Sequence, residues 1–109
     1  MKYFLFLILL IPYVARPDIV YEKLGIKDTQ GREIVSLRIE GSIELDDDII
    51  FNEALADINQ NNYRVQFDSV ILNSPGGNIS SAKQIGIAVR GNHLSTWVMP
   101  HDSCSSACV

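Results

Sequence analysis

The chain has 109 residues, which allows one small domain at most. An apolar fraction of 47% and a charged fraction of 20% are typical of globular proteins and exclude an intrinsically disordered chain. The formal net charge of −4 argues against binding to a phosphate backbone, which needs a basic surface, so we expect no nucleic-acid partner.

The N-terminal segment differs in composition from the rest of the chain. A lysine precedes an apolar run over residues 3–11, a pattern typical of a secretory signal peptide. The run is shorter than the about 20 apolar residues that a bilayer-spanning helix needs. Ala15 suits the end of a signal, whereas Tyr13 is bulky where a small residue is usual. We expect residues 1–15 to be a signal peptide of an exported, periplasmic protein. A short membrane anchor through residues 2–14 and a buried first strand are the alternatives.

Regular patterns begin only after a mixed segment. Residues 16–32 combine charged side chains with a proline and two glycines, so we expect a leader loop or a loose hairpin there. From Glu33 onward the apolar residues become periodic, and residues 33–109 are expected to belong to one domain.

Strand and helix patterns alternate in this domain. Residues 35–39 alternate apolar and polar side chains, the period of a half-buried strand, and short apolar runs at 70–72 and 96–99 indicate two further strands. Between the strands, two apolar stripes have the spacing of amphipathic helices. The stripes consist of Phe51, Ala54, Leu55 and Ile58, and of Ala82, Ile85, Gly86 and Val89.

Polar and flexible residues mark the helix ends. The acidic run Asp46–Asp48 favours the positive end of a helix dipole, and Asn59–Asn62 break that helix. Asn78 or Ser80 can cap the second helix, and Gly91 ends it. Strands separated by helices imply right-handed crossovers. We therefore expect an α/β fold with repeated βαβ units and a mainly parallel sheet.

Two loops follow predicted strands at the sheet edge where open α/β folds bind ligands. The first is Asn73–Gly77, in which a proline fixes one φ angle and two glycines permit φ angles closed to other residues. Such a turn can direct backbone N–H groups toward an anion, including the oxyanion of acyl chemistry. A plain tight turn is the alternative.

The second loop, Asp102–Cys108, joins a strand to the expected start of a helix. Its small residues suit a sharp elbow that exposes a serine hydroxyl. Serine needs a base within hydrogen-bond reach to act as a nucleophile, and a serine-rich turn can equally be a helix cap.

In combination the two loops resemble the Clp protease proteolytic subunit and its relatives in the crotonase superfamily. The shared pattern is L-N-S-P-G-G at residues 72–77, an amphipathic helix, a T-x-V strand at 96–98 and a small-residue elbow. The C-x-S-A-C run at 104–108 is similar to an exported bacterial branch of that superfamily. The resemblance covers residues 34–109 and implies the N-terminal part of an incomplete crotonase-like fold.

The resemblance also implies roles for four residues. Ser106 matches the nucleophile, Gly77 the oxyanion-loop residue that donates its N–H, and Ala107 the second donor. Gly76 supports the turn. The elbow departs from the family pattern because the spacing from Thr96 to the nucleophile is longer by two residues.

A further departure keeps Ser105 as an alternative nucleophile, since Cys108 stands where the family has a small residue. The family's histidine and acid would lie beyond Val109. His93 and His101 precede the elbow and match neither, so a base would have to come from an unusual turn at His101, from a lysine such as Lys83, or from further sequence. We expect this exact chain to be inactive.

The two cysteines have three interpretations. Cys104 and Cys108 are close enough in sequence to form a disulfide in an exported protein, or they are buried thiols. With His101 they could offer three zinc ligands, but structural zinc takes four, so we expect no metal and no cofactor.

The leading function is peptide-bond hydrolysis by a serine nucleophile and a backbone oxyanion hole, acting on a peptide or protein substrate. One rival is a crotonase-like acyl-thioester enzyme, which uses the same amides to hold an enolate. The other is a non-catalytic, truncated pseudo-peptidase that serves as an assembly module, since an open sheet edge invites pairing. Homo-oligomerisation follows from the resemblance to ring-forming relatives.

Overall fold

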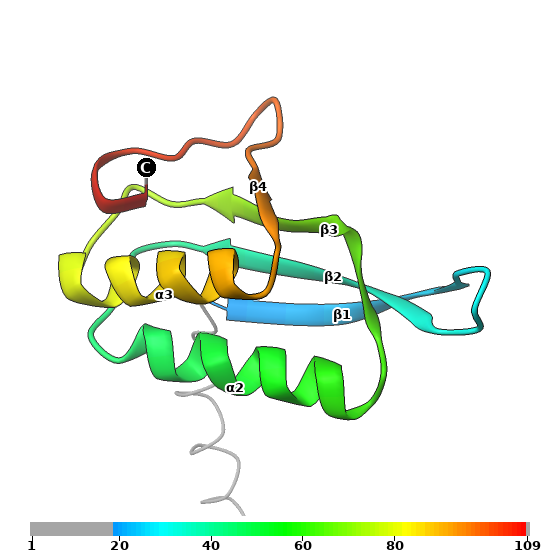
Figure 1. Ribbon diagram of the computed structural model, residues 1–109. Coiled ribbons are helices and arrows are strands. Elements are labelled where there is room, and N and C mark those ends of the chain that lie inside the picture. The colour runs from blue at the N-terminus through cyan, green and yellow to red at the C-terminus, as the bar shows by residue number, and fades with distance from the viewer. Residues whose placement is uncertain (1–18, 109) are drawn as a thin grey trace, which may run out of the picture.

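The computed structural model describes residues 19–108, which form one sheet with two helices (Figure 1). The elements in chain order are β1 (Ile19–Lys27), β2 (Glu33–Glu40), α2 (Asp47–Gln60), β3 (Arg64–Asn73), α3 (Ile79–Gly91), β4 (Ser95–Trp97) and the 3-10 turn η1 (Ser106–Cys108). The signal peptide or anchor expected over residues 1–15, including any membrane association through residues 2–14, lies outside the described residues. Within residues 19–108, no helix has the length and apolar character needed to cross a bilayer.

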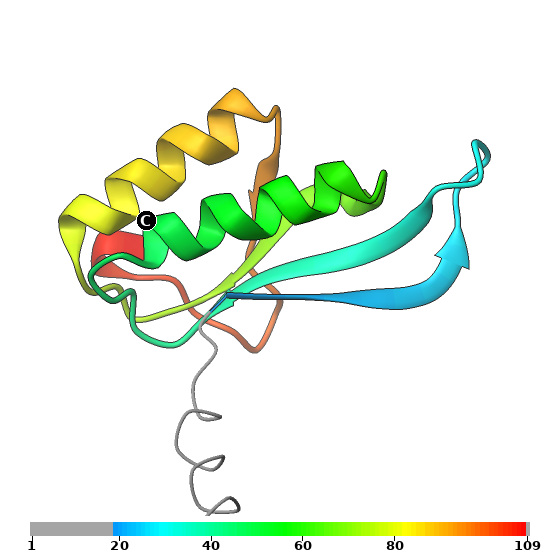
Figure 2. The ribbon, with the colours of Figure 1, turned by 90° about the horizontal axis from the view of Figure 1, so that it is seen from below.

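The sheet has the strand order β1-β2-β3-β4, and both helices cover the same face of it (Figure 2). β2 pairs parallel with β3 and β3 parallel with β4, so β2-α2-β3 and β3-α3-β4 are two successive βαβ units. The expected α/β class is confirmed. The sheet is mixed, however, because β1 pairs antiparallel with β2, with Ile19 opposite Ile39.

Residues 19–32, for which we expected a leader loop or a loose hairpin, form the strand β1 and the turn that joins it to its antiparallel partner β2. Asp28 closes its turn by accepting hydrogen bonds from the backbone N–H groups of Gln30 at 2.9 Å and Arg32 at 2.8 Å. Desolvation raises the pKa of the Asp28 carboxyl, but the bonds from Arg32 and Gln30 outweigh it and hold the pKa below its ordinary value. The turn is therefore held by an ionised carboxylate.

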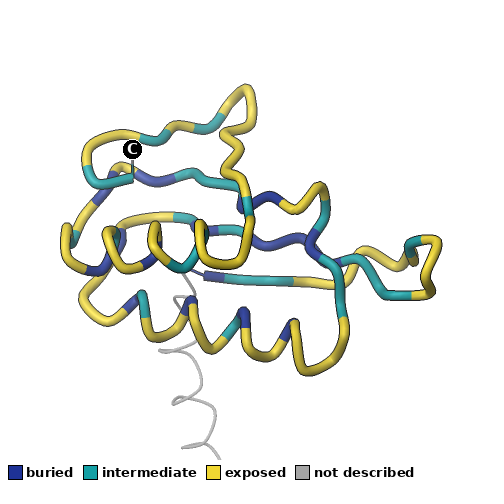
Figure 3. The backbone as a smooth tube through the Cα atoms, viewed as in Figure 1, coloured by how far each residue is buried: buried dark blue, intermediate teal, exposed yellow. Residues whose placement is uncertain are grey.

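The core lies between the helices and the sheet, where the buried residues of Figure 3 gather on the facing sides of strands and helices. The α2 stripe predicted from the sequence contributes Phe51, Leu55 and Ile58, and β2 contributes Val35 and Leu37. Burying each such side chain stabilises the fold by about 1.5–3 kcal/mol before the conformational entropy cost.

The helix ends are set by side chains that the sequence had indicated. Asp47 is buried at the start of α2, where its Oδ2 accepts from the Glu44 N–H at 2.7 Å. Asn78 is the N-cap of α3 and its Oδ1 accepts from the Ser81 N–H at 2.8 Å. This cap orients the start of α3 directly after the glycine pair, and so fixes where that loop leaves the sheet.

Candidate functional site

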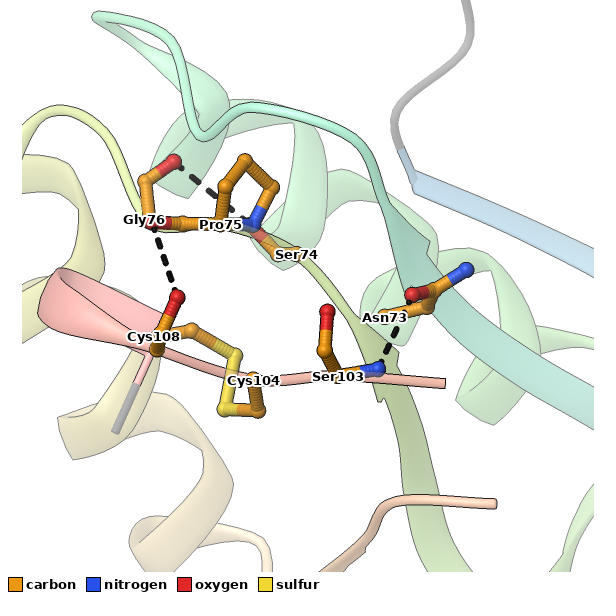
Figure 4. Close-up of a disulfide and its surroundings, with 8 residues drawn as sticks. Asn73, Ser74, Pro75, Gly76, Ser103, Cys104 and Cys108 are labelled. Atoms are coloured by element: carbon orange, nitrogen blue, oxygen red, sulfur yellow. Dashed lines mark hydrogen bonds between the residues drawn. A yellow bond between two sulfur atoms is a disulfide. The ribbon is translucent and has the colours of Figure 1, made fainter. Parts of the chain in front are cut away.

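The two loops singled out in the sequence lie side by side at the carboxyl end of β3. Ser74 is fully buried, and its N–H donates to the Ser103 carbonyl at 2.8 Å. Its own carbonyl accepts from the Ser105 N–H at 3.1 Å, which makes a parallel bridge between Ser74 and Cys104. Asn73 adds a side-chain bond, accepting from the Ser103 N–H at 3.2 Å (Figure 4). The elbow is therefore an extension of the sheet rather than a free loop.

The spacing between β4 and the elbow has a structural explanation. β4 pairs with β3 at Trp97 opposite Ile71, and the next pairing is Cys104 opposite Ser74. From one pairing to the next the chain advances three residues along β3 but seven residues from Trp97 to Cys104. The four additional residues form a loop between the two pairings. A turn in this excursion is closed by the Asp102 N–H, which donates to the Met99 carbonyl at 2.9 Å. The extra residues are absorbed before the elbow, which keeps its own register against Ser74.

Gly76 is the point of contact between the loops. It is buried, has φ +102°, and its backbone packs directly against the elbow. A Cβ at this position would lie 2.7 Å from Ala107 N, 2.8 Å from Ser105 O and 2.8 Å from Ser106 Cβ. Such distances are shorter than non-bonded contacts allow, so only glycine permits this approach.

Gly77 is held by a different neighbour. The Ile43 N–H donates to the Gly76 carbonyl at 2.9 Å, and the Asn78 N–H donates to the Ile43 carbonyl at 2.7 Å. These two hydrogen bonds form a parallel bridge between Ile43 and Gly77. In such a bridge the N–H of Gly77 itself points away from Ile43. Among residues 19–108 it has no hydrogen-bond acceptor, which leaves it available to a ligand.

Ser106 opens the turn η1 and is exposed to solvent. Its φ of +53° lies in the left-handed region, which costs a residue with a side chain about 1–3 kcal/mol and is common at functional turns. Within residues 19–108 its hydroxyl makes no hydrogen bond, and the Ala107 N–H has no acceptor either. Ser105, the alternative nucleophile, has its Oγ 3.5 Å from the Pro75 carbonyl.

No base for the serine is found in the described part of the chain. His93 follows the end of α3, His101 lies in the excursion before the elbow, and Lys83 is on α3, all three exposed. No side chain of residues 19–108 forms a hydrogen bond with Ser106 Oγ. The structure thus packs Gly76, the residue before Gly77, against Ser106 and Ala107, and leaves the proton acceptor unassigned among residues 19–108.

Cys104 and Cys108 form a disulfide, with a Cα–Cα distance of 5.3 Å (Figure 4). The pairing is possible because Cys104 is extended and bridged to Ser74, whereas only Cys108 belongs to the turn η1. On one regular helix the two Cβ atoms would have pointed less favourably. With both sulfurs in this bond, the three-ligand zinc alternative loses two of its ligands.

A pocket of about 650 Å³ lies next to the elbow, between α3 and the sheet. Its wall is mainly apolar, with Ala107 and both cysteines on the elbow side. The other walls include Ile39, Ile43, Leu72, Ile85, Val89 and Thr96. Sequence reasoning had identified several of these residues as core, and their spacing carries no signal that they line an opening. The pocket offers an apolar group a place beside the Ala107 amide.

Ser74 is expected to be a structural support of the glycine loop, because its buried Oγ accepts from the Gly76 N–H at 3.0 Å. Changing Ser74 to alanine leaves that buried N–H without an acceptor, which should lower the free energy of unfolding by about 1–3 kcal/mol. Urea denaturation measures this loss. The exposed Ser80→Ala should change stability by no more than about 0.5 kcal/mol, and equal effects of the two substitutions would contradict the assigned role.

Comparisons of the chain with protein-family models, with curated proteins and with solved structures find no match to any of the three.

Proposed function

We propose that this chain carries the acyl-transfer site of an exported serine peptidase that resembles the Clp protease proteolytic subunit. Ser106 is the nucleophile, and the N–H groups of Gly77 and Ala107 form the oxyanion hole. The observation that carries the proposal is the packing of the Gly76 backbone against Ser106 and Ala107, since it unites a glycine-rich anion loop with an exposed serine. A helix cap or a plain turn would not require the Gly76 backbone to lie so close to Ser106 and Ala107.

The proposed reaction follows from these positions. Ser106 Oγ attacks the carbonyl carbon of a peptide bond, and negative charge develops on the carbonyl oxygen. Two backbone N–H groups without other acceptors can donate to that oxygen, an interaction typically worth about 3–4 kcal/mol per donor in the transition state. The proton of Ser106 must pass to a base, and no side chain of residues 19–108 accepts a hydrogen bond from Ser106 Oγ.

The two rivals predict different chemistry at the same place. A crotonase-like enzyme would use the two amides to hold a thioester enolate and would have no use for a nucleophilic serine. A non-catalytic assembly module would need neither the hydroxyl nor the amides. The exposed, left-handed Ser106 favours the peptidase over both, because neither rival makes use of a serine hydroxyl held at this turn.

A fluorophosphonate probe tests the proposal on the purified, folded protein. We expect a covalent adduct on Ser106, detected by mass spectrometry of the peptide that contains it. The adduct should disappear in Ser106→Ala and persist in Ser105→Ala, which is the matched control. A folded protein without an adduct would support one of the rivals, and an adduct on Ser105 would overturn the assignment of the nucleophile.

A further inference from the structure

We propose that the Cys104–Cys108 disulfide is a redox switch for the Ser106 elbow, closed when the nucleophile is positioned and open when it is released. The inference deepens the proposed function, since it concerns the regulation of the same site. It rests on the placement of the bond around the serine, on the left-handed conformation inside its ring, and on the access to its sulfurs.

The disulfide joins a residue paired with the sheet to the turn η1. Cys104 is anchored in the sheet through its bridge to Ser74, which is fully buried. Cys108 belongs to η1, and its N–H closes this turn by donating to the Ser105 carbonyl at 3.0 Å. The ring closed by the disulfide contains Ser106 at its centre. The covalent bond therefore ties the turn with the nucleophile to the sheet.

Ser106 needs such a tie, because its φ of +53° is unfavourable for a residue with a side chain. The Gly76 backbone packs closely against Ser106 on one side, since an added Cβ there would lie 2.8 Å from Ser106 Cβ. The disulfide constrains Ser106 through the cysteines two residues before and two residues after it. Once that bond opens, Ser106 can relax toward negative φ, and both its hydroxyl and the following Ala107 N–H move relative to Gly77.

The access to the sulfurs and the small size of the ring favour a redox switch over a disulfide that only stabilises the fold. Both cysteines are half-buried, and both line the pocket beside the elbow, where a thiol can reach them. The ring is short, with a sequence separation of 4, so it removes little entropy from the unfolded chain compared with a long loop. Neither cysteine belongs to the buried cluster that contains Phe51 and Leu37. Opening it should change the elbow and leave the fold.

The reaction partner is a dithiol, either a small molecule or a protein. One of its thiolates attacks a cysteine sulfur, which breaks the Cys104–Cys108 bond and forms a mixed disulfide. The second thiolate then displaces the protein thiolate, and the dithiol leaves as a cyclic disulfide. Two electrons pass to the protein, and the two cysteine thiolates take up two protons.

Nuclear magnetic resonance of the chain, oxidised and then reduced with dithiothreitol, tests the switch without requiring activity. We expect the amide signals of Gly76, Ser106 and Ala107 to shift on reduction, and amide hydrogen exchange at the elbow to accelerate about tenfold or more. Core amides such as Val35 and Leu55 should keep their positions. The double variant Cys104→Ser, Cys108→Ser should resemble the reduced chain and should not respond to dithiothreitol.

Two results would overturn the inference: elbow amides that are unchanged by reduction, or reduction that unfolds the whole domain. Failure of the proposed function would look different. If the elbow responds to reduction but Ser106 never reacts with a fluorophosphonate, the peptidase assignment fails and the redox response stands. If labelling occurs at the same rate in both redox states, the switch fails and the nucleophile stands.

Discussion

Replacing Gly77 by alanine is expected to lower the free energy of unfolding by about 4 kcal/mol. The new Cβ would lie 2.2 Å from the Ile43 carbonyl oxygen and 2.8 Å from its nitrogen, both backbone atoms that cannot turn aside. Its φ of +146° adds backbone strain. Since the loop can accept the methyl group only by leaving Ile43, the Gly77 N–H should lose its orientation as well. Urea denaturation and fluorophosphonate labelling of Ser106 measure the two effects.

Gly25→Ala is the matched control for Gly77→Ala. Gly25 also has a positive φ, +79°, but a Cβ there would meet no atom within 4 Å. Its substitution should therefore cost only the backbone term of about 1–2 kcal/mol and leave labelling unchanged. A loss at Gly77 no larger than that at Gly25 would show that the loop is not pinned against Ile43.

Phe51→Ala is expected to destabilise the domain by about 3–5 kcal/mol. Phe51 is fully buried on the inner side of α2, within the cluster that joins this helix to β2 and β3. Truncation removes the ring from an apolar environment and leaves a cavity that the surrounding side chains fill only in part. The shift of the urea midpoint, at constant denaturant dependence, measures the loss.

The neighbouring Ile50 provides the comparison for Phe51, because its side chain is 47% exposed on the same helix. Ile50→Ala should change stability by about 0.5 kcal/mol or less. If the two substitutions had equal effects, α2 would not present the face that its apolar spacing predicts.

Local patterns were sufficient for the parts of the fold whose signal is periodic. The i, i+3, i+4, i+7 stripe of Phe51 to Ile58 predicted α2 and its buried face, and the alternation at Val35 to Ile39 predicted β2. The N-cap of α3 at Asn78 followed from capping chemistry, and α3 ends at Gly91 as expected, although its C-cap is Asn92. Each of these signals lies within one element, so sequence spacing is enough to reveal it.

What the sequence could not reveal depends on distant partners. β1 is exposed over most of its length, so it lacks the alternation of a half-buried strand, and its pairing with β2 is specified by the turn at Asp28. The bridge between Ile43 and Gly77 joins segments without any shared motif. The disulfide was one of three open possibilities, because its geometry depends on Cys104 being held extended by Ser74.

In the candidate site, too, some features could be predicted from local sequence and others depend on distant partners. Resemblance suggested Ser106, Gly77 and Ala107, and the structure places the backbone of Gly76 between them. The left-handed conformation of Ser106 and the apolar pocket beside Ala107 are products of packing, and neither has a local sequence signature.

Binding of a peptide boronate to the ¹⁵N-labelled protein would test most directly whether these groups act on one oxyanion. Boron should become tetrahedral on Ser106, and the amide signals of Gly77 and Ala107 should shift together, with both changes lost in Ser106→Ala. Binding that leaves either amide unmoved, or shifts that persist without the serine hydroxyl, would contradict a shared oxyanion hole.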